Sequence, residues 1–275
     1  MRPLVLKFGG ELLEDPARLH LVVAAIREIA ATTPLAVVHG GGREIDAALK
    51  AAGIEKRQIE GLRITDEPTL DVVVSVLAGS INTRFVAALS TAGIAAVGLT
   101  GADASCGLSD AAPPHRTVDG RVVDLGRVGI PAAGADMRVV DTLLGSGFVP
   151  VVACIGVGRD GRLFNVNADT FAGHLAARLS ARRLVIAGTT PGVLGSNGAT
   201  ITCLDRAAIA RLVSDGTATA GMIAKLRACD DALASGVDDV VIAEGREPAA
   251  LVAAALDAAP AGATRLVRGL QEERP

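Results

Sequence analysis

Short apolar runs rich in Val, Leu and Ile alternate along this chain with longer segments whose apolar residues recur at helical spacing. The runs are Leu4–Leu6, Leu35–Val38, Ile94–Val97, Val149–Val152, Leu184–Ile186 and Val240–Ile242. A run without polar alternation is typical of a strand that is buried on both faces. Because strands that alternate with helices build crossover units, the pattern predicts an α/β protein whose mostly parallel sheet is covered by helices.

The helical segments lie between these runs, at Leu19–Ile29, Ala168–Leu179 and Ile223–Ala234. Sheets of this kind bind ligands at the carboxyl ends of their strands, so the loops that follow the strands are where chemistry is expected. The segment Gly101–Asp124 departs from the pattern because it is rich in Asp, Gly, Pro and Ser. Within it, Asp119–Gly120 predicts a hairpin turn that leaves the sheet.

The charge and composition of the chain disfavour two classes of partner. Its 275 residues carry 27 Lys and Arg against 30 Asp and Glu, so the net charge of -3 gives no basic field for nucleic acid or an anionic membrane. Five Phe without Trp or Tyr leave few stacking platforms for single-stranded nucleic acid. The uncharged stretch Phe85–Ala102 is interpreted as a helix end followed by a strand, and the N-terminus does not resemble a signal peptide. We expect a cytoplasmic protein without nucleic-acid or membrane partners.

The four cysteines are widely spaced and form no Cys-x-x-Cys motif; they are Cys106, Cys154, Cys203 and Cys229. No His stands at a metal-ligand interval from any of them, so the sequence predicts no protein-held metal. Cys154 lies in an apolar run, where a reduced thiol acts as a small hydrophobic side chain.

Two glycine-containing loops follow predicted strands. Lys7 precedes Gly9 and Gly10, and the segment His39–Gly42 carries three successive glycines before a helix. Glycines let the backbone approach an anion closely, and a helix N-terminus offers N–H groups to it, so phosphate is a natural ligand. A strand end followed by a turn explains the first loop equally well. We give His39 no catalytic role, because a lone His at a strand end is more often scaffold.

A third glycine cluster, Gly156–Gly161, matches the dinucleotide-binding fingerprint letter for letter. That fingerprint requires its last glycine to lie in a helix, whereas the residues after Gly161 alternate like an extended strand. Asp160–Gly161 is better interpreted as a hairpin turn. Hydride transfer therefore has no support in the sequence.

Polar residues cluster at Asn165–Asp169, directly before a predicted helix. Asn167 or Asp169 alone would explain a helix cap. Asn165 and Asn167 alternate on an extended backbone, so both can also present amides to a ligand, while Asp169 can hold lysines in place. Lys225 opens a late helix, and with Lys7 it would supply two cations to a transferring phosphoryl group.

Seven motifs recur here in a characteristic order: Leu6–Gly10, His39–Gly42, Gly61–Thr65, Leu77–Asn82, Val123–Gly129, Asn165–Asp169 and Gly221–Lys225. In order and spacing they resemble the amino acid kinase family, and within it the members that phosphorylate N-acetyl-L-glutamate. The resemblance implies a three-layer αβα sandwich around a mainly parallel sheet. It also implies a single domain, 1–275, with an amino-acid lobe at about 1–150 and a nucleotide lobe at about 151–275.

The implied reaction is ATP-dependent phosphorylation of the γ-carboxylate of N-acetyl-L-glutamate, the second step of arginine biosynthesis. By resemblance, Lys7 and Lys225 stabilise the transferring phosphoryl group and Asp169 organises them. The residues that resemble substrate ligands are Gly41, Gly42, Arg63, Asn165 and Asn167. Arg63 would clamp the substrate α-carboxylate, because a guanidinium makes a bidentate contact that Lys cannot.

The nucleotide-binding positions implied by the resemblance are Gly9, Gly10, Thr189, Thr190, Gly192, Val193, Leu194, Thr217 and Thr219. Thr189 stands where the family usually has Asp, which puts one nucleotide contact in doubt. Mg²⁺ would enter mainly with the ATP phosphates, because this ion keeps water and rarely receives an all-protein cage.

The chain begins almost at its first strand, whereas arginine-inhibited relatives carry an extra N-terminal helix, so we expect an unregulated homodimer. The closest alternative is a kinase of the same fold that acts on carrier-protein-linked aminoadipate or glutamate. A non-catalytic ligand-binding member of the fold is a second alternative, which the paired lysines and Asp169 disfavour. A dehydrogenase is a third alternative, and the failed dinucleotide fingerprint disfavours it.

Overall fold

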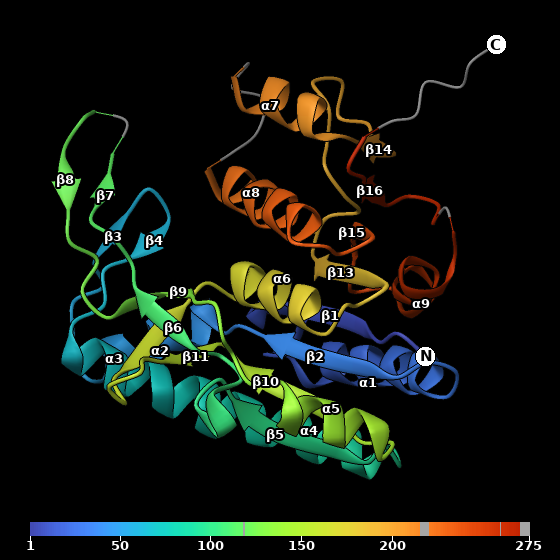
Figure 1. Cartoon of the computed structure of the whole chain (residues 1–275), viewed down its shortest axis with the longest axis horizontal. Helices are drawn as coiled ribbons and strands as arrows, with labels where there is room; N and C mark the ends of the chain where they lie inside the picture. Colours follow the sequence, from blue (N-terminus) through green and yellow to red (C-terminus); the bar gives the residue numbers. More distant parts are fainter. Residues whose placement is uncertain (118, 215–219, 259, 270–275) are drawn as a thin grey trace.

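A computed structural model describes residues 1–117, 119–214, 220–258 and 260–269. Its centre is a sheet with the strand order β14-β16-β15-β13-β1-β2-β10-β5 (Figure 1). Neighbouring strands of this sheet run parallel, apart from the antiparallel pair β15 and β16. The α/β class with a mainly parallel sheet is therefore confirmed. The strands are β1 (Leu4–Phe8), β2 (Leu35–His39), β5 (Ala96–Thr100), β10 (Val149–Ala153), β13 (Arg183–Gly188), β14 (Cys203–Leu204), β15 (Asp239–Glu244) and β16 (Thr264–Leu266).

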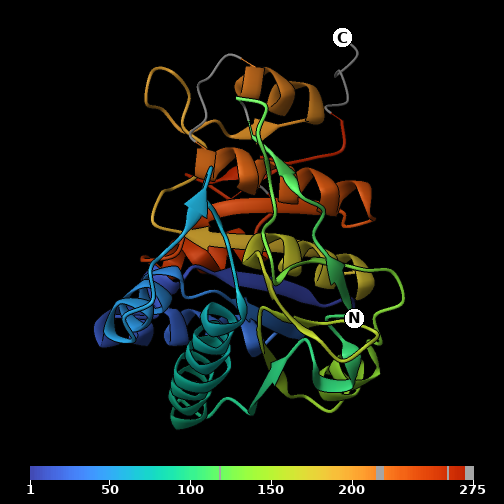
Figure 2. The same ribbon diagram turned by 90° about the vertical axis from the view of Figure 1, so that its left-hand side faces the viewer.

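Helices cover both faces of this sheet, which gives the expected three layers (Figures 1 and 2). One face carries α1 (Pro16–Ala30), α4 (Asn82–Thr91) and α9 (Pro248–Leu256), and the other carries α5 (Arg138–Gly145), α6 (Ala168–Arg178) and α8 (Ala220–Ala234). The remaining helices are η1 (Gly10–Leu12), α2 (Gly42–Ala51), α3 (Glu67–Val74), η2 (Ser75–Ile81), η3 (Asp103–Ser105) and α7 (Arg206–Ser214).

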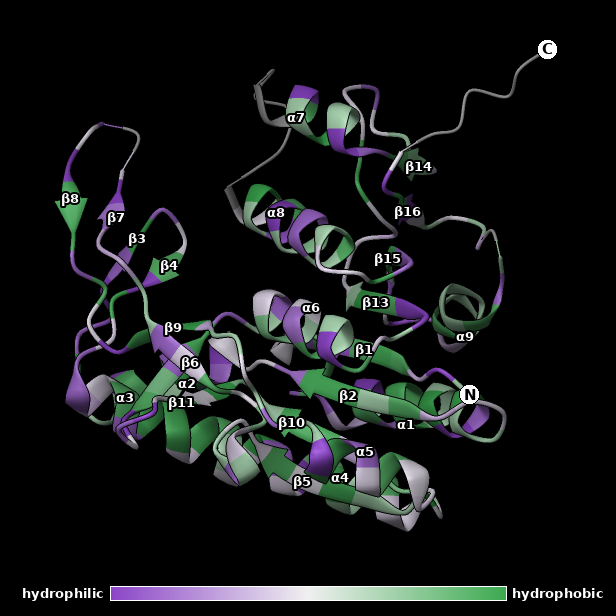
Figure 3. Ribbon diagram, viewed as in Figure 1, coloured by the Kyte–Doolittle hydropathy of each residue, from purple (hydrophilic) through white to green (hydrophobic). Residues whose placement is uncertain are grey.

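The central strands are hydrophobic along their length because helices exclude water from both faces (Figure 3). All five residues of β1 are buried, Lys7 included. Some of the helices begin at side chains that accept hydrogen bonds from otherwise unpaired N–H groups. Asp15 caps α1 in this way, with Pro16 in its first turn, and Asn167 caps α6. Asn167 thus starts α6 directly after β12, whereas η1 separates β1 from the start of α1.

A continuous helical segment runs from Glu67 to Thr91 through α3, the π-helical turn η2 and α4. It is long and apolar enough to cross a membrane by length and composition alone, although part of it packs into the core. The helix followed by a strand that we expected over 85–102 is confirmed. The strand begins later than predicted, at Ala96, because the N–H of Ile94 still donates to Leu89 O at the helix end.

A second sheet in the order β11-β12-β9-β6 lies beside the first. Its strands are β6 (Ser109–Ala111), β9 (Val128–Pro131), β11 (Ile155–Val157) and β12 (Leu163–Val166). β11 and β12 are antiparallel and joined through Gly161, which has a φ of +81°. The predicted hairpin turn is confirmed, and with it the rejection of a dinucleotide-binding loop.

Two hairpins project from the first half of the molecule (Figures 1 and 2). One consists of β3 (Gln58–Ile59) and β4 (Leu62–Arg63), the other of β7 (His115–Arg116) and β8 (Val122–Val123). The second contains the turn predicted within 101–124, while β6 shows that part of this segment joins a sheet. A contact of 2.8 Å between His115 Nε2 and Glu60 Oε2 joins the hairpins.

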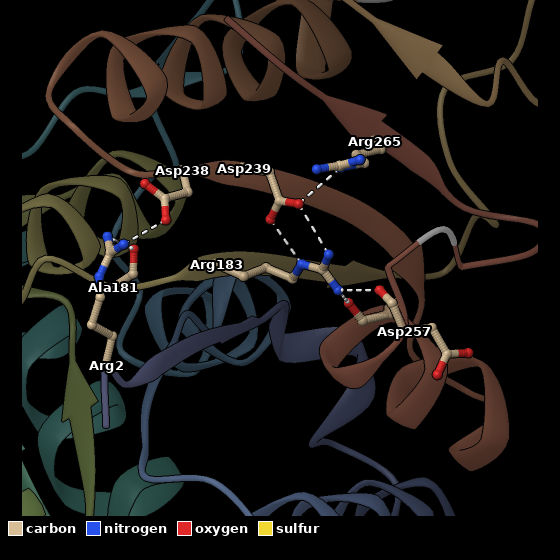
Figure 4. A network of polar contacts seen from close by, with 8 residues as sticks. Arg2, Ala181, Arg183, Asp238, Asp239, Asp257 and Arg265 are labelled. Carbon is tan, nitrogen blue, oxygen red and sulfur yellow. Dashed lines mark hydrogen bonds and ion pairs between the residues drawn. The ribbon is translucent and has the colours of Figure 1, made fainter.

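A buried ion network lies at the amino ends of β13 and β15, opposite the strand ends that carry the glycine loops (Figure 4). Arg183, the first residue of β13, donates from Nε to Asp239 Oδ1 at 2.8 Å and from Nη2 to Asp239 Oδ2 at 3.0 Å. Its Nη1 donates to the carbonyls of Ala254 and Asp257 at the end of α9. Arg265 on β16 donates to the same Asp239 at 2.8 Å. This network fixes one helix and three strands far from the loops that follow β1 and β2.

Candidate active site

A carboxylate that contacts two lysines, one with each of its oxygens, lies at the carboxyl end of β1. Asp169, in the first turn of α6, places Oδ1 2.8 Å from Lys7 Nζ and Oδ2 3.4 Å from Lys225 Nζ. Lys7 comes from β1 and Lys225 from α8, so three elements that are distant in sequence meet here. The structure therefore brings together all three residues that we predicted as catalytic.

Burial and mutual charge set the protonation of this group. Burial opposes ionisation of Asp169, but the charges of Lys7 and Lys225 outweigh it and hold its pKa below the usual value. Burial and the nearby charge of Lys7 lower the pKa of Lys225. Burial acts on Lys7 in the same direction, yet its shorter contact with Asp169 raises its pKa. The single negative charge of Asp169 thus only partly balances the positive charges of two lysines. The remaining positive charge favours binding of a further anion at this position.

The two glycine loops contact each other beside the lysines. A Cβ added at Gly10 would stand 2.6 Å from the Cα of Gly41, so the loops touch through their backbones. A side chain at Gly41 would also overlap Leu77 and Ile81, which face the loop from η2. The start of α2 has no side-chain cap, so its first N–H groups remain available to an anion.

His39 lies directly before the second loop as a neutral, buried side chain. Its Nε2 is 3.0 Å from Asn82 Nδ2, which also donates to Val151 O at 2.9 Å. Burial lowers the pKa of His39 to about 4. Because Asn82 donates to Nε2, the proton of the neutral ring belongs on Nδ1. His39 supports the loop from beneath, and we give it no part in the chemistry.

Arg63 on β4 points a partly free guanidinium into the same region. Its Nη2 donates to Asp46 Oδ1 at 2.5 Å, and Asp46 is held in turn by Lys56. Among the residues that the structure describes, the buried Nη1 of Arg63 has no hydrogen-bond partner. A buried donor without a partner is costly unless a ligand accepts from it. The arrangement suits a ligand carboxylate.

Asn165 and Asn167 lie where the alternation predicted. Asn165 on β12 donates from Nδ2 to Thr65 Oγ1 at 3.1 Å. Asn167 caps α6 by accepting from the N–H groups of Asp169 and Thr170, so its Oδ1 is already occupied. The capping interpretation is thus correct for Asn167, and any ligand contact from its side chain falls to Nδ2.

The predicted nucleotide segment after β13 lies outside the cavity that the glycines line. Arg246 donates to Thr189 O at 2.8 Å, Val193 is buried with its N–H on Thr264 Oγ1, and Leu194 is exposed. Because β13 pairs with β1 in parallel, Thr189, Thr190 and Gly192 nevertheless follow a strand end on the same edge of the sheet. Thr217 and Thr219 lie outside the described residues.

A cavity of about 280 Å³ lies beside Lys7 and the two glycine loops. It is lined by Lys7, both glycine loops, Arg63, Asn165 and Asn167, together with Glu11, Gln58, Leu62, Leu77, Val128 and Cys154. No cluster of three or more metal-binding side chains occurs in the described ranges. Asp169 is engaged by lysines, which leaves Glu11 as the carboxylate in the described lining that could face a Mg²⁺ ion.

Three cavity or support residues were missed from the sequence. Asp46 orients Arg63, Asn82 orients His39, and Glu11 lines the cavity. Glu11 directly follows the motif Leu6–Gly10, and its place beside that loop was visible in the sequence. Asn82 ends the motif Leu77–Asn82, but nothing local indicates the partner of Asp46 or of Asn82, since these partners are 17 and 43 residues away in the chain.

Comparison with known proteins agrees with this geometry. The family model of the amino acid kinase family matches residues 2–244. The chain belongs to the amino acid kinase family. The resemblance that the motifs predicted is confirmed, and so is the family fold.

Two relatives in this family carry the same name. The acetylglutamate kinase of Novosphingobium aromaticivorans is 40% identical over 269 residues, which cover 94% of this chain and 88% of that protein. The acetylglutamate kinase of Brucella abortus is 42% identical over 255 residues, which cover 89% of this chain and 84% of that protein.

A solved structure shares the amino acid kinase fold at low identity. It is N-acetylglutamate synthase from Neisseria gonorrhoeae, complexed with coenzyme A and N-acetyl-glutamate. The TM-score is 0.83 at 23% identity over 98% of this chain, which spans 60% of that synthase. This likeness supports the fold and not the activity.

Proposed function

We propose that this chain transfers the γ-phosphoryl group of ATP to the γ-carboxylate of N-acetyl-L-glutamate, giving N-acetyl-L-glutamyl 5-phosphate and ADP. The Lys7–Asp169–Lys225 group at the end of a glycine-lined cavity is the observation that carries this proposal. Two relatives that carry the name acetylglutamate kinase, at 40% and 42% identity over most of the chain, support the choice of acceptor.

The chemistry needs charge and positioning and no base. A glutamyl carboxylate has a pKa of about 4.3, so the acceptor is already ionised at neutral pH and has no proton to lose. Its oxygen attacks the phosphorus in line with the departing ADP oxygen. Lys7 and Lys225 neutralise the charge that develops on the phosphoryl oxygens, while Asp169 holds both ammonium groups in position. Mg²⁺ would supply further neutralisation of the phosphates.

The substrate is proposed to bind through groups of the first half of the chain and of β12. Arg63 presents its unpaired Nη1 to the α-carboxylate, and Asp46 fixes the guanidinium plane. Asn165 and Asn167 line the same cavity and offer amide groups. Gly41 and Gly42 bring backbone N–H groups close to the anion at the start of α2.

The nucleotide is proposed to bind through Gly9 and Gly10 and through the segment Thr189–Leu194, with Thr217 and Thr219 beyond the described residues. Strands from residues 4–153 form one half of the main sheet and strands from 183–266 the other. This division supports an amino-acid lobe at about 1–150 and a nucleotide lobe at about 151–275. We further infer that the protein is cytoplasmic and forms a homodimer. Gel filtration with light scattering would test the dimer.

The acceptor is tested by measuring ADP release with saturating MgATP. N-acetyl-L-glutamate is compared with glutamate, N-acetyl-aspartate, carbamate and a carrier-protein-linked aminoadipate. We expect the highest kcat/KM with N-acetyl-L-glutamate. Higher kcat/KM with the carrier-linked acceptor would replace the proposed substrate, and ADP release with none of the acceptors would refute the kinase function.

A further inference from the structure

Glu11 folds back over the glycine loop that it follows. Both of its carboxylate oxygens lie against Gly9, so that a Cβ on Gly9 would overlap them. The side chain is only partly exposed, and it lines the cavity together with Lys7 and Gly10. The carboxylate therefore occupies the face of the loop that opens into the cavity.

The Glu11 carboxylate is not tied to a protein group. Among the residues described, it makes no hydrogen bond or ion pair. Its charge reaches Lys7, where it contributes after Asp169 to raising the lysine pKa. Glu11 is also the acidic residue in the described lining of this cavity, whereas Asp169 lies behind it between two lysines.

An acidic side chain at this place affects phosphate binding. If the Gly9–Gly10 loop receives nucleotide phosphates, as in the proposed function on which this inference rests, a carboxylate there repels metal-free nucleotide. Carboxylate and phosphate oxygens together, however, are the ligands that Mg²⁺ takes in kinase sites. The same side chain thus opposes the free nucleotide and favours the nucleotide that carries a divalent cation.

We propose that Glu11 is a specificity-determining residue that makes nucleotide binding depend on a divalent cation. The carboxylate would attract the divalent cation that the phosphates carry, whereas it repels the phosphates themselves. Lys7 alone would accept either form of the nucleotide, because it attracts phosphate whether or not a cation is present. Glu11 adds the discrimination, and it does so without a covalent role in the transfer.

The test measures the dissociation constant of a non-hydrolysable ATP analogue, AMP-PNP, by calorimetry with excess Mg²⁺ and again with EDTA. The ratio of the two constants reports the dependence on the cation. We expect Glu11→Gln to reduce this ratio about tenfold relative to the unmodified chain, mainly by tightening the binding of metal-free AMP-PNP. Glu11→Asp keeps the charge and should retain most of the ratio.

The control is Glu28→Gln, which removes the same charge from the exposed side of α1 and should leave the ratio unchanged. A ratio for Glu11→Gln within about twofold of the unmodified chain would overturn the inference while leaving the kinase function intact. Equal tightening with and without Mg²⁺ would also overturn it, since Glu11 would then only repel phosphate. Absence of any AMP-PNP binding to the unmodified chain would instead refute the proposed function, and the inference with it.

Discussion

Asp169 on α6 contacts Lys225 on α8 across 3.4 Å, so the position of one cation depends on how two helices pack. The second oxygen of the same carboxylate holds Lys7 on β1 at 2.8 Å. The packing of α8 against α6 therefore sets where Lys225 lies relative to Asp169, which also holds Lys7. The group can therefore be tested in two ways, by removing one of its charged side chains and by changing the contact between the two helices.

Removing the late lysine should slow turnover without unfolding the chain. We expect Lys225→Ala to lower kcat by about 10²-fold, the range found when one transition-state donor is removed. The Lys225 side chain is 19% exposed and Asp169 keeps Lys7 as its partner, so the melting temperature should change little. Lys50→Ala, at an exposed site in the last turn of α2, is the matched control. Near-normal kcat in Lys225→Ala would contradict the role given to this residue.

The spacing of α6 and α8 should control the rate through Gly173. A Cβ at this position would lie 3.2 Å from both Ala228 O and the Cβ of Ala232. Gly173→Val pushes the helices apart and moves Lys225 from Asp169, so we expect kcat to fall by about tenfold or more. The double variant Gly173→Ala with Ala232→Gly removes the contact with the Ala232 side chain but not the one with Ala228 O, so it should recover part of the activity that Gly173→Ala loses. Full activity in Gly173→Val would show that this contact does not position the lysine.

Sequence patterns predicted the parts of the site that single positions determine. Lys7 lies near the end of a buried strand and Asp169 opens a helix, and both features are visible in the local sequence. The orientation of Arg63 was not predictable, because Asp46 reaches it only once β4 and α2 have packed. The pairing of His39 with Asn82 likewise depends on the position of α4 against β2. Contacts of this kind arise from tertiary packing, which periodicity does not encode.

Acid should destabilise the protein through His39. Its pKa is about 4 in the folded chain and 6.5 in the unfolded chain, so between these values the unfolded chain binds the additional proton. Stability therefore falls as pH decreases from 6.5 to 4, by up to about 3 kcal/mol from this residue. His39→Gln should flatten the pH dependence of the unfolding free energy, measured with urea, over this interval. An unchanged slope in the variant would contradict a neutral, buried His39.

The buried ion network around Asp239 should contribute to stability and not to catalysis. Asp239→Asn leaves the buried Arg183 without its charge partner, which we expect to cost about 3–5 kcal/mol of unfolding free energy. The neighbouring Asp238 pairs with Arg2 at an exposed site, so Asp238→Asn should cost less than about 1 kcal/mol (Figure 4). Urea unfolding of both variants gives the comparison. Equal costs would contradict the difference in burial on which the prediction rests.

The central claim is tested most directly by trapping the product. An acyl phosphate reacts with hydroxylamine to give a hydroxamate, which colorimetry and mass spectrometry identify. With MgATP and N-acetyl-L-glutamate, we predict N-acetyl-L-glutamyl hydroxamate in amounts equal to the ADP released. ADP release without the hydroxamate, or formation of neither, would contradict phosphorylation of the γ-carboxylate.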